Sequence, residues 1–357
     1  MDCRHELLFL RRIPKDIMRE CSSEEHSFLY NYVIIGAVDD FIRQAYGELL
    51  TEKQVYMPAH TCGSKNPLTN ALFKLHWSAK VNARRKLPLK KIWFRKMCRH
   101  DFHNDKPTCY IFMGGQYIAG CPELREYIYS LNKDNKVVIK YADLIAKKHY
   151  RDFERVRNSA DLLITYDKDE SEKYAITYYG NRTYSRLLEV TEPESFAADV
   201  YYIGYAKDRL DTILHVYRKL TQNGLTCRFD LVGVPEEQQQ SLPGICYVSK
   251  IPYAESLKRL CEAKCVLEIS QRGSKSCTMR LPESITYHRL LLTNCDVENS
   301  GYYIPDTMFS FHEPENIDID ALKKPIPYSA FREADIHIAP SDFLHFVDAQ
   351  FNEKEMT

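Results

Sequence analysis

Residues 199–206 read DVYYIGYA, and residues 210–224 read LDTILHVYRKLTQNG. The first segment is a short β-branched and aromatic run, which is typical of a buried strand. The second places apolar residues three or four positions apart, as on one face of a helix, and Gly224 stands where a C-cap is expected. A strand followed by an amphipathic helix is the repeating unit of parallel sheets, so we expect an α/β fold.

The same alternation continues through the second half of the chain. Further strands are expected at residues 227–234, 246–251, 265–270 and 290–294, with helices at 253–263 and 281–287. Five strands and their helices within about 100 residues predict a compact, doubly wound domain.

The first half alternates in the same way, with expected strands at residues 30–37, 109–115, 136–143 and 162–167. Helices are expected at 38–50, 122–131 and 168–175. Residues 181–199 show no periodicity and are interpreted as an interdomain crossover. We therefore divide the chain into domains at residues 1–185 and 186–340, followed by a C-terminal helix and tail at 341–357.

The composition of the chain excludes several classes of protein. The chain has 357 residues, of which 44% are hydrophobic, and its 16 Phe and 25 Tyr exclude a wholly disordered chain. No apolar run approaches the roughly 18 residues of a membrane span, and the N-terminus has no apolar signal core. The twelve cysteines are scattered without a C-x-x-C pair, which favours reduced thiols. These features predict a cytoplasmic protein.

Although the net charge of the chain is zero, one region is strongly basic. Residues 51–100 hold twelve Lys and Arg but one acidic residue, Glu52. Within the segment 80–106, cations alternate with bulky apolar residues, which suits contact with an anionic membrane surface, with Trp93 and Phe94 as an apolar anchor. The alternative is a solvated basic helix whose apolar stripe belongs to the core. Nucleic acid is not expected as a partner, because no nucleic-acid-binding fold accompanies the patch and the pI is 7.2.

Ligands of open parallel sheets bind at the carboxyl ends of the strands. The loop QRGSKSCTMRLPE at residues 271–283 follows one expected strand and opens a helix. Its glycine, hydroxyl groups, cations and helix N-terminus suit a phosphate group, although a solvated loop with a capping carboxylate at Glu283 is the alternative. Two more cations, Lys207 and Arg209, follow the first strand of this domain.

These pieces resemble the donor-binding domain of GT-B-fold glycosyltransferases, particularly bacterial enzymes of capsule, O-antigen and lipopolysaccharide assembly. The resemblance covers YYIGYAKDRLDTILHVYRKL, IPYAESLKRL and VLEISQRGSKSCTMRLPESITYHRLLLTN, within residues 199–311. It implies two Rossmann-like domains facing across a cleft, a nucleotide-sugar donor on the second, and a saccharide acceptor, which can be lipid-linked, on the first.

The resemblance also implies roles for individual residues. Glu283 would accept hydrogen bonds from the ribose hydroxyls, and cations would offset the diphosphate charge, so that neither a metal nor another cofactor is needed. The backbone of residues 251–253 would meet the base. The implied donor-binding residues are Gly204, Lys207, Arg209, Ile251, Tyr253, Gly273, Ser274, Ser276, Thr278, Arg280 and Glu283.

An inverting enzyme also needs a base on the acceptor side to deprotonate the attacking hydroxyl. The candidates in the first half are Asp39, Asp40 and His60.

Other interpretations remain open at this point. Asp167 and Asp169 form a D-x-D at the end of an apolar strand, a pattern that chelates a divalent ion in metal-dependent transferases of the GT-A fold. We favour the alternative that Asp167 caps the following helix. A non-catalytic nucleotide- or glycan-binding module and a sugar-nucleotide epimerase could share the expected GT-B fold.

Overall fold

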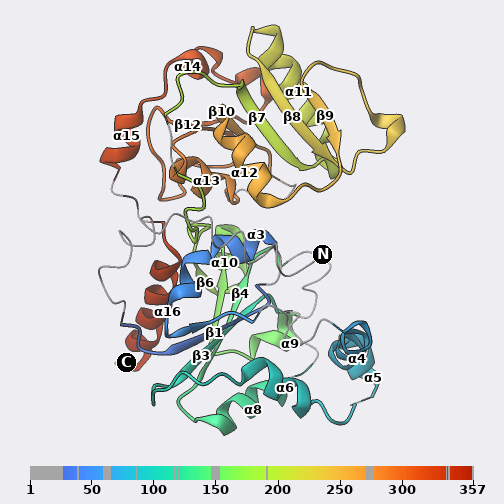
Figure 1. The fold of residues 1–357 in the computed structure, drawn as a ribbon, viewed down its shortest axis with the longest axis vertical. Coiled ribbons are helices and arrows are strands. Elements are labelled where there is room, and N and C mark those ends of the chain that lie inside the picture. The colour runs from blue at the N-terminus through green and yellow to red at the C-terminus, as the bar shows by residue number, and fades with distance from the viewer. Residues whose placement is uncertain are drawn as a thin grey trace.

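The computed structural model describes residues 27–37, 40–58, 66–85, 87–115, 118, 121, 123–145, 153–189, 192–270, 276–334, 336 and 338–355. These residues form two α/β domains, each built on a six-stranded sheet (Figure 1). Neighbouring strands are parallel throughout both sheets. The predicted α/β class with two parallel-sheet domains is therefore confirmed.

The first sheet has the strand order β2-β1-β3-β4-β5-β6. Its strands are β1 (Asn31–Ile35), β2 (Val55–Tyr56), β3 (Thr108–Met113), β4 (Lys136–Tyr141), β5 (Leu162–Thr165) and β6 (Thr177–Tyr178). The helices of this half are α3 (Asp40–Ala45), η1 (Gly47–Thr51), α4 (Pro67–Trp77), α5 (Ala79–Arg84), α6 (Lys91–Cys98), α8 (Glu123–Leu131), α9 (Phe153–Arg157) and α10 (Lys168–Tyr174). The strand order reverses direction between β1 and β3, which opens a crevice at their carboxyl ends.

The second sheet has the order β12-β11-β10-β7-β8-β9 and reverses between β7 and β10. Its strands are β7 (Ala198–Tyr205), β8 (Cys227–Val232), β9 (Ile245–Val248), β10 (Ala263–Glu268), β11 (Leu290–Thr293) and β12 (Met308–Ser310). The helices that follow β7 are η3 (Lys207–Arg209), α11 (Leu210–Gln222), η4 (Glu236–Gln238), α12 (Tyr253–Cys261), α13 (Arg280–Thr286), η5 (Pro314–Asn316), α14 (Ile319–Lys323), α15 (Tyr328–Glu333) and α16 (Pro340–Glu355).

Helix α16 returns to the first domain and lies beside its sheet (Figure 1). Its Leu344 and Val347 are fully buried in a core that includes Tyr32 of β1. The Tyr32 hydroxyl lies 3.0 Å from the carbonyl oxygen of Leu344 and 2.5 Å from Oδ1 of Asp348. The last helix in the sequence therefore completes the core of the first domain.

The basic segment is folded into the first domain. Trp93 and Phe94 of α6 are buried against Phe73 and Trp77 of α4, so the expectation that they anchor the protein in a membrane is wrong. An aromatic residue in a basic segment can face either side of its helix, and here the apolar stripe belongs to the core. No helix within the described ranges is both long enough and apolar enough to cross a bilayer.

We expect Leu344→Ala to destabilise the protein by roughly 2–5 kcal/mol, because it leaves a cavity under β1. Chemical denaturation would measure the change. Asn352→Ala changes an exposed residue of the same helix and is the control. A Leu344→Ala protein as stable as this control would contradict the role given to α16.

Candidate functional site

A cavity of about 380 Å³ lies between the two domains. Its walls are formed at the carboxyl ends of strands from both sheets, as the topology predicts. The residues from the first half are Phe41, Ile42, Ala45, Tyr46, Met113, Lys140, Ala142, Asp143, Leu144, Tyr166, Asn181 and Thr183. Those from the second half are Arg209, Tyr253, Thr278, Met279, Arg280 and Glu283.

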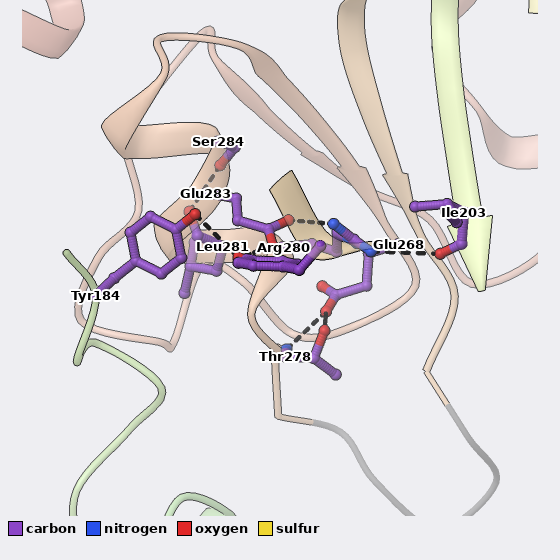
Figure 2. Close-up of polar contacts among 9 residues, drawn as sticks. Tyr184, Ile203, Glu268, Thr278, Arg280, Leu281, Glu283 and Ser284 are labelled. Atoms are coloured by element: carbon purple, nitrogen blue, oxygen red, sulfur yellow. Dashed lines mark hydrogen bonds and ion pairs between the residues drawn. The ribbon is translucent and has the colours of Figure 1, made fainter. Parts of the chain in front are cut away.

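Glu283 is the central polar group of the second-domain wall (Figure 2). It lies in the first turn of α13, where it forms an ion pair with Arg280 and accepts a 2.7 Å hydrogen bond from the hydroxyl of Tyr253. Burial raises the pKa of the Glu283 carboxyl above its usual range, while Arg280 and Tyr253 oppose that rise. The Tyr253 hydroxyl also lies 2.9 Å from that of Tyr184, in the crossover between the domains.

A second buried carboxylate, Glu268, shapes the loop that leads into α13 (Figure 2). Oε1 of Glu268 accepts hydrogen bonds of 2.6 Å from the backbone N–H of Thr278 and 2.5 Å from its hydroxyl. Oε2 accepts a 2.8 Å bond from Thr293 at the end of β11. These contacts fix Thr278 beside Arg280 at the end of β10.

Arg209 adds a second guanidinium group to this wall. Its Nη1 donates to the carbonyl of Ile269 at 2.5 Å, and its Nη2 donates to the carbonyl of Tyr205. Its buried Nε has no hydrogen-bond partner among the described residues. The arginine is thus held in place beside the cavity by two backbone carbonyl groups.

The first-domain wall presents one cation and one carboxylate at the end of β4. Lys140 is buried, and its Nζ lies 2.5 Å from the hydroxyl of Tyr46 and 3.0 Å from that of Thr183. Burial lowers the pKa of Lys140 to about 7. Asp143 is half-buried, and its Oδ1 accepts a 3.0 Å bond from the backbone N–H of Leu144.

The structure brings only part of the predicted site together. The predicted residues that line the cavity are Arg209, Tyr253, Thr278, Arg280 and Glu283. Four others lie elsewhere: Gly204 is within β7, Lys207 is exposed on η3, Ile251 precedes α12, and Ser276 lines a neighbouring cavity. Asp39, His60, Gly273 and Ser274 lie outside the described residues, as does the side chain of Asp40, the first residue of α3.

Lys140 and Asp143 were not predicted as site residues, although a signal for them exists. Both stand at the carboxyl end of the run KVVIKYAD, which the sequence identifies as a strand. Only the placement of this strand beside β3, near the point where the strand order reverses, brings them to the cavity.

Asp167 is the N-cap of α10, and its side chain accepts a hydrogen bond from the backbone N–H of Glu170 at 3.0 Å. The favoured capping interpretation is confirmed. The alternative GT-A fold is wrong, because two complete parallel-sheet domains are present.

One group of potential metal ligands occurs among the described residues. A carboxylate oxygen of Glu268 and the thiols of Cys277 and Cys295 lie within 4.8 Å of one another, all buried. A hydrogen bond between the two thiols and their burial raise the pKa of Cys277 well above its usual range. These groups could ligate a soft divalent cation, but the residues that line the cavity do not include them.

No protein-family model and no curated protein sequence matches this chain. Among solved structures, a putative UDP-N-acetylglucosamine 2-epimerase from Listeria monocytogenes aligns over 93% of this chain and 98% of its own, with a TM-score of 0.53 and 11% identity. The fold is GT-B. A glycosyltransferase of kitacinnamycin aligns with the GT-B chain over 90% of its length and 99% of its own, at 8% identity and a TM-score of 0.43. An alpha-glucosyltransferase in complex with UDP-glucose and DNA containing an abasic site aligns over 68% and 75%, at 12% identity and a TM-score of 0.42.

Proposed function

We propose that this GT-B protein is a glycosyltransferase that moves a sugar from a nucleotide-sugar donor to a saccharide acceptor, in the assembly of surface polysaccharide or lipopolysaccharide. The observation that carries the proposal is the second-domain wall, where Arg209 and Arg280 line the cavity together with the buried Glu283. Guanidinium groups pair well with phosphate, and a carboxylate accepts hydrogen bonds from vicinal hydroxyls. This combination suits the diphosphate and ribose of a nucleotide sugar.

The two arginines would also stabilise the leaving diphosphate. The negative charge on this group grows in the transition state, and fixed cations in a partly enclosed site stabilise it without reorganising. Arg209, which two backbone carbonyl groups hold in place, contributes its positive charge at this wall. We therefore propose a mechanism that does not require a metal ion.

On the acceptor side, an inverting transfer needs a group that removes the proton from the attacking hydroxyl. Asp143 is the carboxylate that the described part of the first domain contributes to the cavity. We assign it the role of general base. Asp143 is half-buried and lines the cavity, where an acceptor hydroxyl would be placed beside it.

We expect one member of a panel of nucleotide sugars to lose its nucleotide on incubation with the protein, and the activity to survive EDTA. Asp143→Asn should lower the rate at least about 100-fold, because it removes the base. Asp169→Asn, which changes an exposed carboxylate outside this cavity, is the control. Coupled detection of released diphosphate measures the rate of each protein with and without EDTA, and chromatography identifies the sugar product.

Two outcomes would contradict this function, and a third would contradict the proposed mechanism. An epimerised nucleotide sugar without release of nucleotide would identify an epimerase. Binding without turnover would identify a non-catalytic module. Complete loss of activity in EDTA that Mn²⁺ reverses would contradict the metal-independent mechanism.

The second test concerns Glu283. Glu283→Gln keeps the size of the side chain but removes a charged acceptor, so binding of the preferred nucleoside diphosphate should weaken by about 1.5–3 kcal/mol, or roughly 10- to 150-fold. Calorimetric titrations with UDP, GDP, CDP and ADP would measure it. Glu255→Gln, on α12 of the same domain, is the control. Unchanged affinity in Glu283→Gln would remove this residue from the nucleotide site.

We further propose that the acceptor is lipid-linked and that α4 and α6 dock on an anionic membrane. Leu68, Leu72 and Leu75 are exposed along one side of α4. Helix α6 packs on α4 and exposes cations, namely Lys91, Arg95 and Lys96. Exposed leucines beside cations suit the boundary between acyl chains and anionic headgroups.

We expect the protein to sediment with anionic liposomes at low salt and to be released as the salt concentration rises. Replacing Lys91, Arg95 and Lys96 with Gln should weaken binding about 100-fold, since each cation near the leaflet contributes roughly 1 kcal/mol. Lys90 stays unchanged because it is buried, 3.8 Å from Glu123. The control replaces three exposed lysines of the second domain, Lys258, Lys323 and Lys324. Binding that ignores lipid charge, or no binding, would contradict this docking.

A further inference from the structure

Lys140 has an unusual environment for a buried cation. Its Nζ contacts the hydroxyls of Tyr46 and Thr183, and it lies 4.0 Å from the ring centre of Phe343 on α16. The ring centres of Tyr46 and Tyr179 lie 5.2 and 5.4 Å away. Aromatic faces and hydroxyl oxygens stabilise an ammonium group, but none of these partners carries a negative charge.

The charged groups around Lys140 do not neutralise it. No ion pair involves it among the described residues, and Arg182, from the segment after β6, adds a second positive charge nearby. On α16, the neighbouring Asp342 interacts with Tyr179. Asp143 lines the same cavity without a described contact to Nζ. The free protein therefore holds a buried cation without a described anionic partner beside the substrate cavity.

Such an arrangement is costly in the empty protein, because burial disfavours the charged form of a lysine. The cost is relieved when a negative group of a ligand enters the cavity and pairs with Nζ. On the second-domain wall, by contrast, the positive charge of Arg280 is already balanced by Glu283.

We propose that Lys140 binds an anionic group, a carboxylate or a phosphate, that is carried by the acceptor or by the transferred sugar. This inference rests on the proposed function, since it takes the cavity as the site of sugar transfer. Lys140 belongs to the first-domain wall together with Asp143, whereas Arg209 and Arg280 stand on the wall assigned to the donor diphosphate. The sugar side of the reaction is thus selective for acidic sugars or phosphorylated acceptors.

The proposal predicts a pH dependence with a definite sign. A ligand that pairs with the ammonium form binds only the protonated fraction of Lys140, and that fraction falls tenfold for each pH unit above its pKa of about 7. Affinity for an acidic ligand should therefore fall roughly tenfold between pH 6 and pH 8.

The test uses NMR on the full chain labelled with ¹³C at the lysine ε-carbons and saturated with whichever of UDP, GDP, CDP or ADP binds. Lys140→Met identifies the resonance, and Met is an apolar, flexible replacement that can pack on Phe343. Lys136→Met, on the same strand and over the ring of Phe351, is the matched control. The added probes are methyl glucuronide, methyl phosphate and the neutral methyl glucoside.

We expect methyl glucuronide or methyl phosphate to raise the titration midpoint of Lys140 by about one pH unit or more, which corresponds to at least tenfold tighter binding to the protonated form. The two acidic probes distinguish a carboxylate-bearing sugar from a phosphorylated acceptor. Methyl glucoside should leave the midpoint unchanged. Lys140→Met should lose the binding of the acidic probe, and Lys136→Met should keep it.

Two results would overturn the proposal. One is a midpoint that no probe moves. The other is a midpoint that the nucleoside diphosphate alone raises, which would assign Lys140 to the donor phosphates. The affinity for nucleotides distinguishes these failures from failure of the proposed function. If the protein binds a nucleotide but the acidic probes have no effect, only the role of Lys140 is overturned. If the protein binds none of the four diphosphates, both proposals are overturned.

Discussion

The ion pair between Arg280 and Glu283 determines the geometry of the second-domain wall of the cavity. A buried carboxylate is tolerated only where a charge and hydrogen bonds compensate for its lost hydration, and Arg280 and Tyr253 provide these. Arg280 and Tyr253 also line the cavity. The contacts that compensate for the burial of Glu283 therefore fix these two side chains in position. The hydrogen bond between the hydroxyls of Tyr253 and Tyr184 then connects this wall to the crossover between the domains.

The two walls differ in how their charges are compensated. On the second domain, the protein itself pairs Glu283 with Arg280 and holds Arg209 on two carbonyl groups. On the first domain, Lys140 is surrounded by hydroxyls and aromatic rings. The second-domain wall is therefore preorganised, whereas the first-domain wall leaves a charge to be satisfied by what binds there.

The sequence predicts the longer strands well, because each is a continuous apolar run between turn residues. β2 and β6 have two residues each and β12 has three, too few to produce a periodic signal. The second-domain wall was predictable in part, since Arg280 and Glu283 are close in sequence and open a helix. Lys140 was not, because its burial depends on Phe343 of α16, about 200 residues away in the chain. Nor does a basic composition reveal that Trp93 faces the core.

The packing of α16 on β1 has a consequence for how the chain folds as it is synthesised. Tyr32 and Asp348 are 316 residues apart, and the whole second domain lies between them. The first domain leaves the ribosome first, yet the part of its core that α16 covers stays incomplete until the later domain has been made. We therefore expect the second domain, whose contacts are closer in sequence, to complete its core earlier. The nascent first domain would meanwhile expose apolar surface, which makes this interval the one in which a chaperone has most to protect.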